Sequence, residues 1–237
     1  MNIIIFSTED YHHTYYINKI NEIYPINLVV YERRRLKKDY DTTNPYQVDQ
    51  DKFEKSYFFS KVSNKIDRKI KIIKVKSINS KEVSEIALNF KYDIVIVFGC
   101  GKINETIIRD YDNKIINIHR GLASKYRGLD SELWAIKNYD FQSIGTTIHY
   151  IDKNLDTGDI VYQKRLTLRK DDQIYKLRAK TTELAVEGTL KFINDLILQK
   201  VVKLKQEKYG RYYSSMDLLE KKDCEKMFQN YIRNNCK

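Results

Sequence analysis

The sequence is poor in the residues that mark disulfide-rich, collagen-like or disordered chains. It contains three cysteines, two prolines and eight glycines among 237 residues. The odd number of cysteines and their lack of metal-ligand spacing argue against a disulfide framework and against a zinc site. No apolar run approaches the roughly 20 residues that a membrane-spanning helix needs, and the first residues lack the pattern of a signal peptide. We therefore expect a cytoplasmic protein without a metal site.

The charge balance is basic, but it identifies no partner by itself. The 43 Lys and Arg residues outnumber the 32 Asp and Glu residues, which gives a net charge of +11. Such a balance suits nucleic acid, a membrane surface or a small polyanion. Because the cations are spread along the chain, the net charge carries little weight. The apolar content of 42% is enough for a core, and the length predicts one large domain with at most a small appendage.

Strands and helices are predicted to alternate through the first half of the chain. Apolar runs predict strands at residues 2–6, 28–31, 71–75 and 93–98, and helical periodicity predicts helices at residues 15–24, 48–66, 81–90 and 104–109. A strand, a helix and a second strand within about 30 residues form a right-handed βαβ unit. This alternation predicts an α/β, Rossmann-like fold with a mostly parallel twisted sheet and flanking helices.

The second half of the chain adds two paired strands and a long helix. The strands are predicted at residues 144–151 and 159–168, and the amphipathic helix at residues 171–199. Because this helix closes the layer over the sheet, we assign residues 1–199 to one α/β domain. Residues 200–237 are predicted to form a short C-terminal extension of one or two strands and a helix.

Three polar side chains are expected to meet at one edge of the sheet. Asn117 and His119 lie two positions apart at the end of a predicted strand, so their side chains point to the same face. Open α/β sheets bind ligands at the carboxyl ends of their strands. Asp156 lies in a turn-forming segment after another apolar run. An amide that donates to an oxyanion, an imidazole that carries a proton and a carboxylate beside it suit acyl transfer without a covalent intermediate.

Five short segments in a fixed order give these residues their context. They are Asn117-Ile118-His119, Tyr126-Arg127-Gly128, Trp134-Ala135-Ile136, Gly145-Thr146-Thr147-Ile148-His149 and Leu155-Asp156-Thr157-Gly158-Asp159-Ile160. An isolated Asn-x-His pair is more often structural, but the five segments together resemble the folate-dependent formyltransferase family. The resemblance is dense over residues 93–165. It implies the formyltransferase fold, 10-formyltetrahydrofolate as formyl donor, an amine acceptor, and Asn117, His119 and Asp156 as the catalytic residues.

The resemblance also implies where the two substrates bind. The pterin is expected against a loop and one further residue, namely Phe98, Gly99, Cys100, Gly101, Lys102, Ile103 and Asp152. The acceptor side is implied for Tyr126, Arg127 and Gly128. His12 is a further candidate because it follows the first strand, and Arg33 is another because an Arg fork at a strand end suits phosphate. The basic run at residues 33–35 is equally typical of a solvated surface.

Two residues near these segments are interpreted as structural. His149 alternates within a predicted strand, which favours a packed or surface position. Cys100 has no neighbour in the sequence that would stabilise a thiolate, so it is interpreted as a small filler beside a turn.

Comparison with three branches of the family narrows the choice of acceptor. The loop at residues 7–12 has no glycine and two carboxylates, unlike the phosphate-binding loop of glycinamide ribonucleotide transformylase. The residues after Gln199 are too few for the barrel domain of methionyl-tRNA formyltransferase. The length and the Gly210-Arg211-Tyr212-Tyr213 segment resemble the sugar-nucleotide N-formyltransferase branch. We therefore expect a nucleotide-linked amino-dideoxy-sugar, first dTDP-4-amino-4,6-dideoxyglucose and second a 3-amino sugar, used for O-antigen in lipopolysaccharide biosynthesis.

Other interpretations stay open. The acceptor could instead be glycinamide ribonucleotide, methionyl-tRNA or water, the last making the protein a formyl-folate hydrolase. A basic nucleic-acid-binding α/β domain is the non-enzymatic interpretation. Many family members have Ser-Leu-Leu-Pro soon after the catalytic His, whereas this chain has Arg120-Gly121-Leu122-Ala123-Ser124, which leaves the geometry of the acceptor-side loop open. The resemblance suggests a homodimer, formed through the C-terminal segment.

Overall fold

The computed structural model describes residues 1–33, 38–206 and 209–236, and its centre is a seven-stranded sheet. The strand order is β3 (Lys71–Val75), β2 (Ile26–Glu32), β1 (Ile3–Ser7), β4 (Ile94–Phe98), β5 (Ile115–His119), β7 (Gly145–Tyr150) and β8 (Ile160–Arg165). Pairing is parallel from β3 through β5 and antiparallel for β7 and β8. The predicted mostly parallel α/β fold is confirmed.

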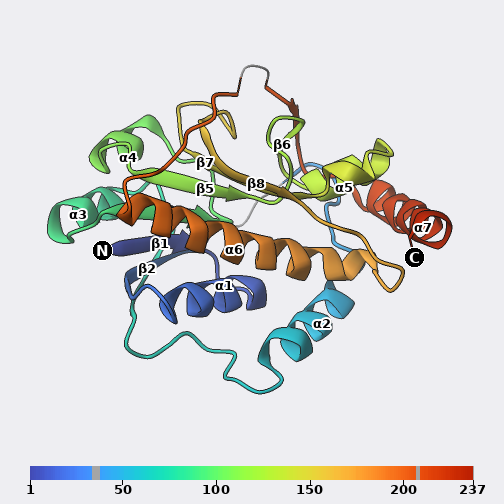
Figure 1. Ribbon diagram of the computed structural model, residues 1–237, viewed down its shortest axis with the longest axis horizontal. Helices are drawn as coiled ribbons and strands as arrows, with labels where there is room; N and C mark the ends of the chain where they lie inside the picture. Colours follow the sequence, from blue (N-terminus) through green and yellow to red (C-terminus); the bar gives the residue numbers. More distant parts are fainter. Residues whose placement is uncertain (34–37, 207–208, 237) are drawn as a thin grey trace.

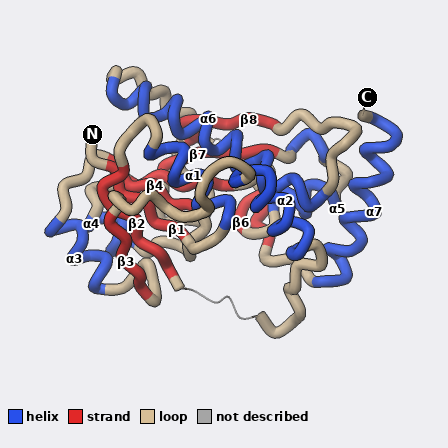
Figure 2. The backbone as a smooth tube through the Cα atoms, turned by 90° about the horizontal axis from the view of Figure 1, so that it is seen from below, coloured by secondary structure: helices blue, strands red, loops and turns tan. Residues whose placement is uncertain are grey.

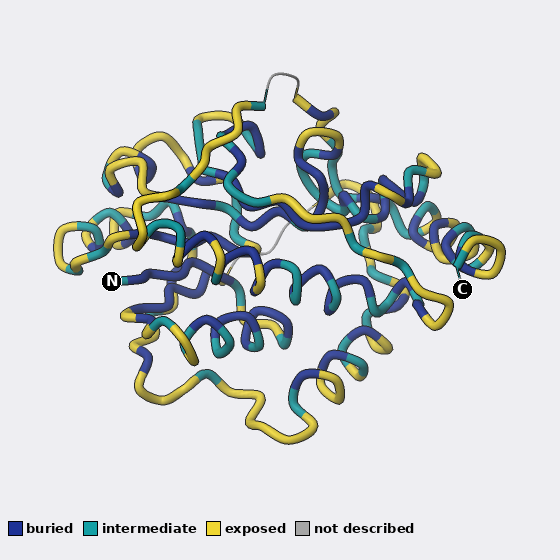
Figure 3. The backbone as a smooth tube through the Cα atoms, viewed as in Figure 1, coloured by how far each residue is buried: buried dark blue, intermediate teal, exposed yellow. Residues whose placement is uncertain are grey.

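Helices cover both faces of the sheet, because the central strands are apolar on both sides. In β1, Ile3 and Ile5 pack toward α1 (Tyr11–Asn21) and α6 (Leu177–Ile197). The alternate residues Ile4 and Phe6 pack toward the other face, which α3 (Lys81–Asn89) and α4 (Glu105–Asp110) cover. Figure 1 shows α1 and α6 lying along one side of the sheet, and Figure 3 shows the strands buried between the two layers.

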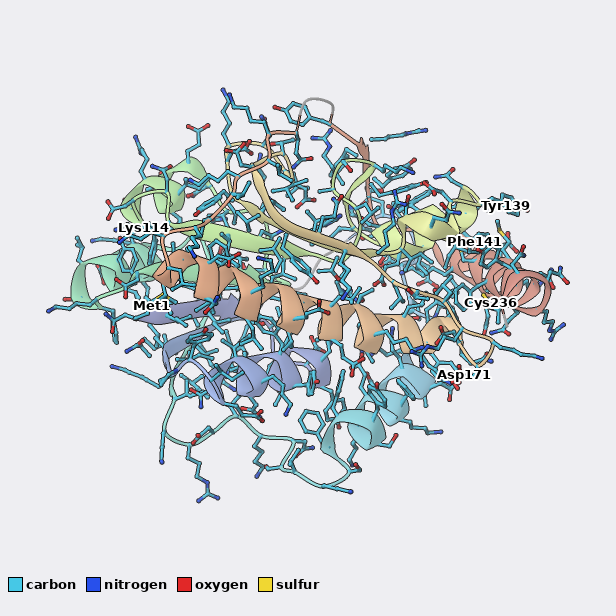
Figure 4. The ribbon with its side chains drawn as sticks, viewed as in Figure 1. Met1, Lys114, Tyr139, Phe141, Asp171 and Cys236 are labelled. Carbon is cyan, nitrogen blue, oxygen red and sulfur yellow. The ribbon has the colours of Figure 1, made fainter. Side chains whose placement is uncertain are left out.

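A third apolar cluster joins the C-terminal segment to the rest of the chain. It contains α5 (Ser131–Lys137), α7 (Leu218–Asn235) and two short 3-10 helices, at Phe141–Ser143 and Ile174–Lys176. Figure 2 shows α5 and α7 beside one another at the end of the molecule away from the N-terminus, and Figure 4 places Tyr139, Phe141 and Cys236 at this end. A short parallel pair, β6 (Tyr126–Gly128) with β9 (Arg211–Tyr213), makes a second connection.

Three predicted helices differ from the structure at their ends. Helix α6 begins at Leu177, six positions after the predicted start, and a 3-10 helix at Ile174–Lys176 precedes it. Helix α1 begins at Tyr11, four positions before the predicted start, so His12 belongs to its first turn and not to a loop. Helix α2 (Gln47–Phe59) ends seven residues before the predicted end, since residues 60–70 pass around the bottom of the molecule as turns and extended chain. Within the described parts of the chain, none of the helices has the length and apolarity to span a membrane.

The connections create a divergence at the carboxyl edge of the sheet. From β1 the chain first adds β2 and β3 on one side and then returns to β4 on the other side of β1. The loops that follow β1 and β4 therefore run in opposite directions. In open α/β sheets such a switch point opens a crevice for ligands.

Candidate active site

A cavity of about 630 Å³ lies at this carboxyl edge. One part of its lining, which we call the glycine-loop wall, consists of residues 97–103, 151, 152 and 154–156. A second part, which we call the charged wall, consists of His12, His13, Arg120, Glu132 and Arg178, and its His13 lies against Gly99. Asn117, His119 and Asp156 also line the cavity.

The three predicted catalytic side chains meet around the Asp156 carboxylate. Asn117 Nδ2 donates a hydrogen bond to Asp156 Oδ1 at 3.2 Å. His119 Nδ1 lies 3.5 Å from the other oxygen, Oδ2, as an ion pair. The backbone N–H of Gly128 donates to the same Oδ2 at 2.8 Å. The sequence therefore placed these three groups together correctly, and their catalytic role stays a prediction.

Asp156 is held as a carboxylate despite being only 5% exposed. Burial alone would raise the pKa of its carboxyl group. The neighbouring His119 and His149 rings and the Gly128 N–H outweigh burial and hold that pKa well below its usual value. The residue also has a left-handed backbone, with φ of 55°, which turns its side chain into the cavity from the loop before β8.

The partner atoms around His119 specify where its protons are. Nε2 lies 2.7 Å from the carbonyl oxygen of Tyr126, which only accepts hydrogen bonds, so Nε2 carries a proton. Nδ1 faces the Asp156 carboxylate, which also only accepts. Both ring nitrogens of His119 therefore face acceptor oxygens, which fixes the orientation of the ring beside Asp156.

His149 is a site residue that the sequence interpretation missed. It is buried, as a packed residue would be, but it also lines the cavity, with Nε2 3.4 Å from Asp156 Oδ1 and 3.3 Å from Asn117 Nδ2. Its Nδ1 lies 2.8 Å from the carbonyl oxygen of Tyr150, which only accepts hydrogen bonds, so Nδ1 carries a proton. The antiparallel register of β5 and β7, which sets Asn117 opposite His149, was the available signal.

The glycine-loop wall is formed largely by backbone. A side chain at Gly99 (φ +85°) would stand 2.5 Å from Cε1 of His13, so only glycine fits. The N–H of Gly101 donates to Glu32 Oε2 at 2.8 Å, and the N–H of Ile78 donates to Glu32 Oε1 at 2.9 Å. Glu32 is 5% exposed, so this buried carboxylate at the end of β2 fixes the loop. The sequence interpretation did not recognise Glu32.

All seven residues predicted to bind the pterin line the cavity: Phe98, Gly99, Cys100, Gly101, Lys102, Ile103 and Asp152. A flat bicyclic ring with donors and acceptors on its edge suits a wall of exposed backbone groups in a cavity of this size. The residues present therefore fit the pterin of a folate. Their contact with it stays a prediction.

The charged wall is assembled from distant segments. The fully buried Glu54 of α2 accepts from Arg178 of α6, at 2.5 Å from Nε and 2.9 Å from Nη2. His12 Nδ1 lies 3.7 Å from Glu54 Oε2 and has no hydrogen-bond partner in the described parts of the chain, although the residue is only 4% exposed. Burial, followed by Arg120 and Arg178, lowers the pKa of His13 to about 3. Burial also holds the pKa of His12 well below its usual value, so both rings are neutral near pH 7.

The residues predicted on the acceptor side are divided by the structure. His12 and Gly128 line the cavity, whereas Tyr126, Arg127 and Arg33 are not among its lining residues. Arg127 instead donates to the carbonyl oxygens of Gly210 and Leu155, which ties the β6 segment to its neighbours. Arg33 is exposed, and the two arginines after it lie outside the described residues. Contact of Tyr126, Arg127 or Arg33 with a substrate stays a prediction.

The described residues contain no group of three or more His, Cys, Asp or Glu side chains arranged to hold a metal ion. The site groups are instead an amide, an imidazole and a carboxylate, at the carboxyl edge of a doubly wound sheet. These features define an α/β protein whose site carries the groups that acyl transfer uses. The sequence profile of the formyl transferase family matches residues 37–193, and the chain belongs to this family.

Formyltransferases are found both among the proteins similar in sequence and among the solved structures similar in fold. The methionyl-tRNA formyltransferase of Finegoldia magna is 29% identical over 127 residues, which are 53% of this chain and 41% of that relative. The chain thus spans less than half the length of the curated relatives that it matches. A sugar N-formyltransferase from Shewanella is similar in structure, with a TM-score of 0.62, 17% identity, and coverage of 90% of this chain and 76% of that chain.

An N-formyltransferase from Helicobacter canadensis, solved with folinic acid and dTDP-3-aminofucose, is also similar in structure. Its TM-score is 0.62 at 17% identity, with coverage of 92% of this chain and 72% of that chain. At such identities the likeness establishes a shared fold.

Proposed function

We propose that the chain is an N-formyltransferase that moves a formyl group from 10-formyltetrahydrofolate to the amine of a nucleotide-linked amino-dideoxy-sugar. The observation that carries the proposal is the meeting of Asn117, His119 and Asp156 in one cavity, beside a wall suited to a pterin. Membership of the formyl transferase family supports the formyl chemistry. The sugar-nucleotide acceptor is supported by the shared fold with sugar N-formyltransferases.

In this reaction the amine nitrogen bonds to the formyl carbon, the bond from that carbon to the folate nitrogen breaks, and one proton passes from the amine to the folate nitrogen. His119, charged beside Asp156, stabilises the negative charge that builds up on the formyl oxygen. Asn117 is held within reach of the same site by Asp156 and His149. Asp156 keeps His119 protonated and is placed to pass on the proton that leaves the amine.

The charged wall gives the acceptor its polar surroundings. Neutral His12 offers buried ring nitrogens, and its Nδ1 has no hydrogen-bond partner among the described residues. Among the sugars, we place a 4-amino sugar first, dTDP-4-amino-4,6-dideoxyglucose in particular, and a 3-amino sugar second. We also keep as proposals a homodimer, a cytoplasmic location and a role in O-antigen synthesis.

The test is incubation of the protein with formyl-folate and a panel of nucleotide-linked 3-amino and 4-amino sugars, followed by mass spectrometry. The proposal predicts that at least one sugar gains a formyl group, and that Asn117→Ala, His119→Ala and Asp156→Ala each abolish most of the gain. Near wild-type turnover in all three variants would remove the catalytic assignment.

A formyl group on glycinamide ribonucleotide or on methionyl-tRNA, with no sugar modified, would identify a different acceptor. The proposed formyl transfer itself would stand. Steady consumption of formyl-folate without any acceptor would instead identify a hydrolase.

A further inference from the structure

The cations that line the cavity differ in how firmly the protein already binds them. Arg178 is committed to Glu54 through two hydrogen bonds and to Asp51 Oδ1 at 3.0 Å. Lys221, from α7, donates to the carbonyl oxygen of Thr42 at 2.8 Å and pairs with Asp130 at 3.3 Å. Both groups are engaged in holding elements together, so neither is free to bind a substrate without loss of these contacts.

Arg120 is held much more loosely. Its one ion-pair contact within the described residues is Nη1 to Glu132 Oε2 at 3.7 Å, beyond hydrogen-bond distance. The other Glu132 oxygen accepts a hydrogen bond from Thr181 Oγ1 at 2.6 Å, so that carboxylate is partly engaged elsewhere. The Arg120 side chain is 31% exposed in the cavity. Its planar fork of N–H donors is therefore available to an incoming anion.

The backbone that carries Arg120 is fixed. Thr147 Oγ1 donates to the carbonyl oxygen of Gly121 at 2.7 Å and accepts from the N–H of Ala123 at 3.1 Å. A side chain at Gly121 would stand 2.7 Å from Cβ of Ser131, so the turn needs glycine. The guanidinium group therefore extends from an anchored turn that directly follows the catalytic His119.

The charge of Arg120 also acts on the rest of the charged wall. After burial, it is the largest influence that lowers the pKa of His13, and it contributes to lowering the pKa of His12. The charge of Arg120 thus adds to burial in lowering both pKa values, as does the charge of Arg178. An anionic group beside these neutral rings would meet the loosely held Arg120. Lys102 of the glycine-loop wall is a second cation in the lining, but its single ammonium cannot form a bidentate fork.

We infer that Arg120 binds the diphosphate of the acceptor and so sets the distance between that anion and the amine that reacts beside His119. This inference rests on the proposed function, because the nucleotide-linked sugar supplies the diphosphate. A fork of N–H groups binds two phosphate oxygens at once, which a lysine cannot reproduce. The other anion that folate chemistry brings to such a cavity is the glutamate tail of the donor, and the experiment separates the two.

The experiment is calorimetric titration of the protein with thymidine diphosphate and, separately, with tetrahydrofolate carrying one or three glutamates. The variants are Arg120→Gln and Arg120→Lys. The matched control is Arg165→Gln, which removes one exposed cation from β8, outside the cavity. The Arg120→Gln variant should bind the diphosphate about 10- to 100-fold more weakly than the wild type, because it loses charge-assisted hydrogen bonds. Arg120→Lys should recover part of the loss, and Arg165→Gln should bind as the wild type does.

The affinity for tetrahydrofolate should be the same in every variant as in the wild type. Replacing Arg120 should have no effect on it with either one or three glutamates on the folate. A tail-dependent loss of folate binding in Arg120→Gln, with diphosphate binding intact, would overturn the inference. So would equal losses in Arg120→Gln and Arg165→Gln, which would indicate only a general effect of net charge.

These titrations need no turnover, so they separate this inference from the proposed function. Diphosphate binding that depends on Arg120 in a protein that transfers no formyl group would leave the subsite standing and remove the activity. Formyl transfer to a nucleotide sugar, together with undiminished diphosphate binding in Arg120→Gln, would support the activity and remove the Arg120 subsite.

Discussion

The two walls of the cavity are built by different physical means. The glycine-loop wall comes from two short continuous segments, in which Gly99 has a positive φ and Glu32 fixes the backbone of the loop. The charged wall comes from side chains of α1, α5, α6 and the turn after β5, with Arg178 bound to the buried Glu54 of α2. In the proposed function the first wall binds the donor and the second binds the acceptor.

The largest effect is expected at Asp156, where the proposed catalytic groups meet. Asp156→Asn removes the charge that His119, His149 and Gly128 all contact, so turnover should fall on the order of a thousandfold. The measurement is the turnover number at saturating donor and acceptor. Asp195→Asn, which removes a surface carboxylate paired with Lys191, is the control and should keep wild-type turnover. A loss of less than about tenfold in Asp156→Asn would show that the carboxylate is dispensable.

Next comes the pH dependence that the charged wall imposes on stability. His12 and His13 have pKa values below the usual 6.5, His13 at about 3, so the unfolded chain binds protons that the folded chain does not. The contribution of these two neutral rings to the free energy of unfolding is therefore fully present above pH 6.5. It decreases as the pH falls below that value. At pH 5 the loss should be about 2 kcal/mol for His13, and His12 should add a loss of the same sign.

Urea unfolding at several pH values measures this effect. The double variant His12→Gln/His13→Gln should show a flatter profile between neutral pH and pH about 5, whatever its absolute stability. A wild-type profile just as flat would mean that these rings titrate normally in the folded protein.

A smaller effect is expected for His149, whose Nε2 contacts both Asn117 Nδ2 and Asp156 Oδ1. His149→Ala should lower turnover about 10- to 100-fold, since it frees the Asn117 amide to rotate. His149→Gln, which can present an acceptor oxygen near the former Nε2, should recover part of that loss. The Michaelis constant for the donor should stay close to that of the wild type. Equal defects in both variants would point to a packing role and not to positioning of the amide.

The smallest effect tests the glycine-loop wall. Glu32→Gln leaves one carbonyl acceptor for two N–H donors, those of Gly101 and Ile78, and should loosen the loop without touching the catalytic groups. The Michaelis constant for formyl-folate should rise about tenfold, with turnover nearly unchanged. Glu105→Gln, an exposed change in the first turn of α4, is the control. A change confined to turnover would contradict the assignment of this wall to the donor.

The sequence predicted what lies within continuous segments. The strand alternation, the meeting of Asn117 with His119, and the glycine turn after β4 all follow from local patterns, and the structure contains each of them. The family resemblance assigned Asp156 to the site, because the local sequence does not show which strand end its turn approaches.

The missed residues depend on contacts between distant segments. Glu54 and Arg178 are 124 positions apart, and nothing in either helix shows that the two side chains are buried against each other. Glu32 precedes a basic run and was not singled out, yet the backbone of two loops donates hydrogen bonds to it. His149 could have been recognised from the antiparallel pairing of β5 and β7, had that register been worked out.

The most direct test follows the formyl carbon itself. The donor is prepared with carbon-13 in its formyl group and mixed with the protein and the sugar nucleotide that the panel identifies, and the reaction is followed by nuclear magnetic resonance. The account predicts that the label appears as a formamide carbon on the sugar, and that Asp156→Asn slows this on the order of a thousandfold. Label released only as formate, at a rate that the sugar does not change, would contradict the account.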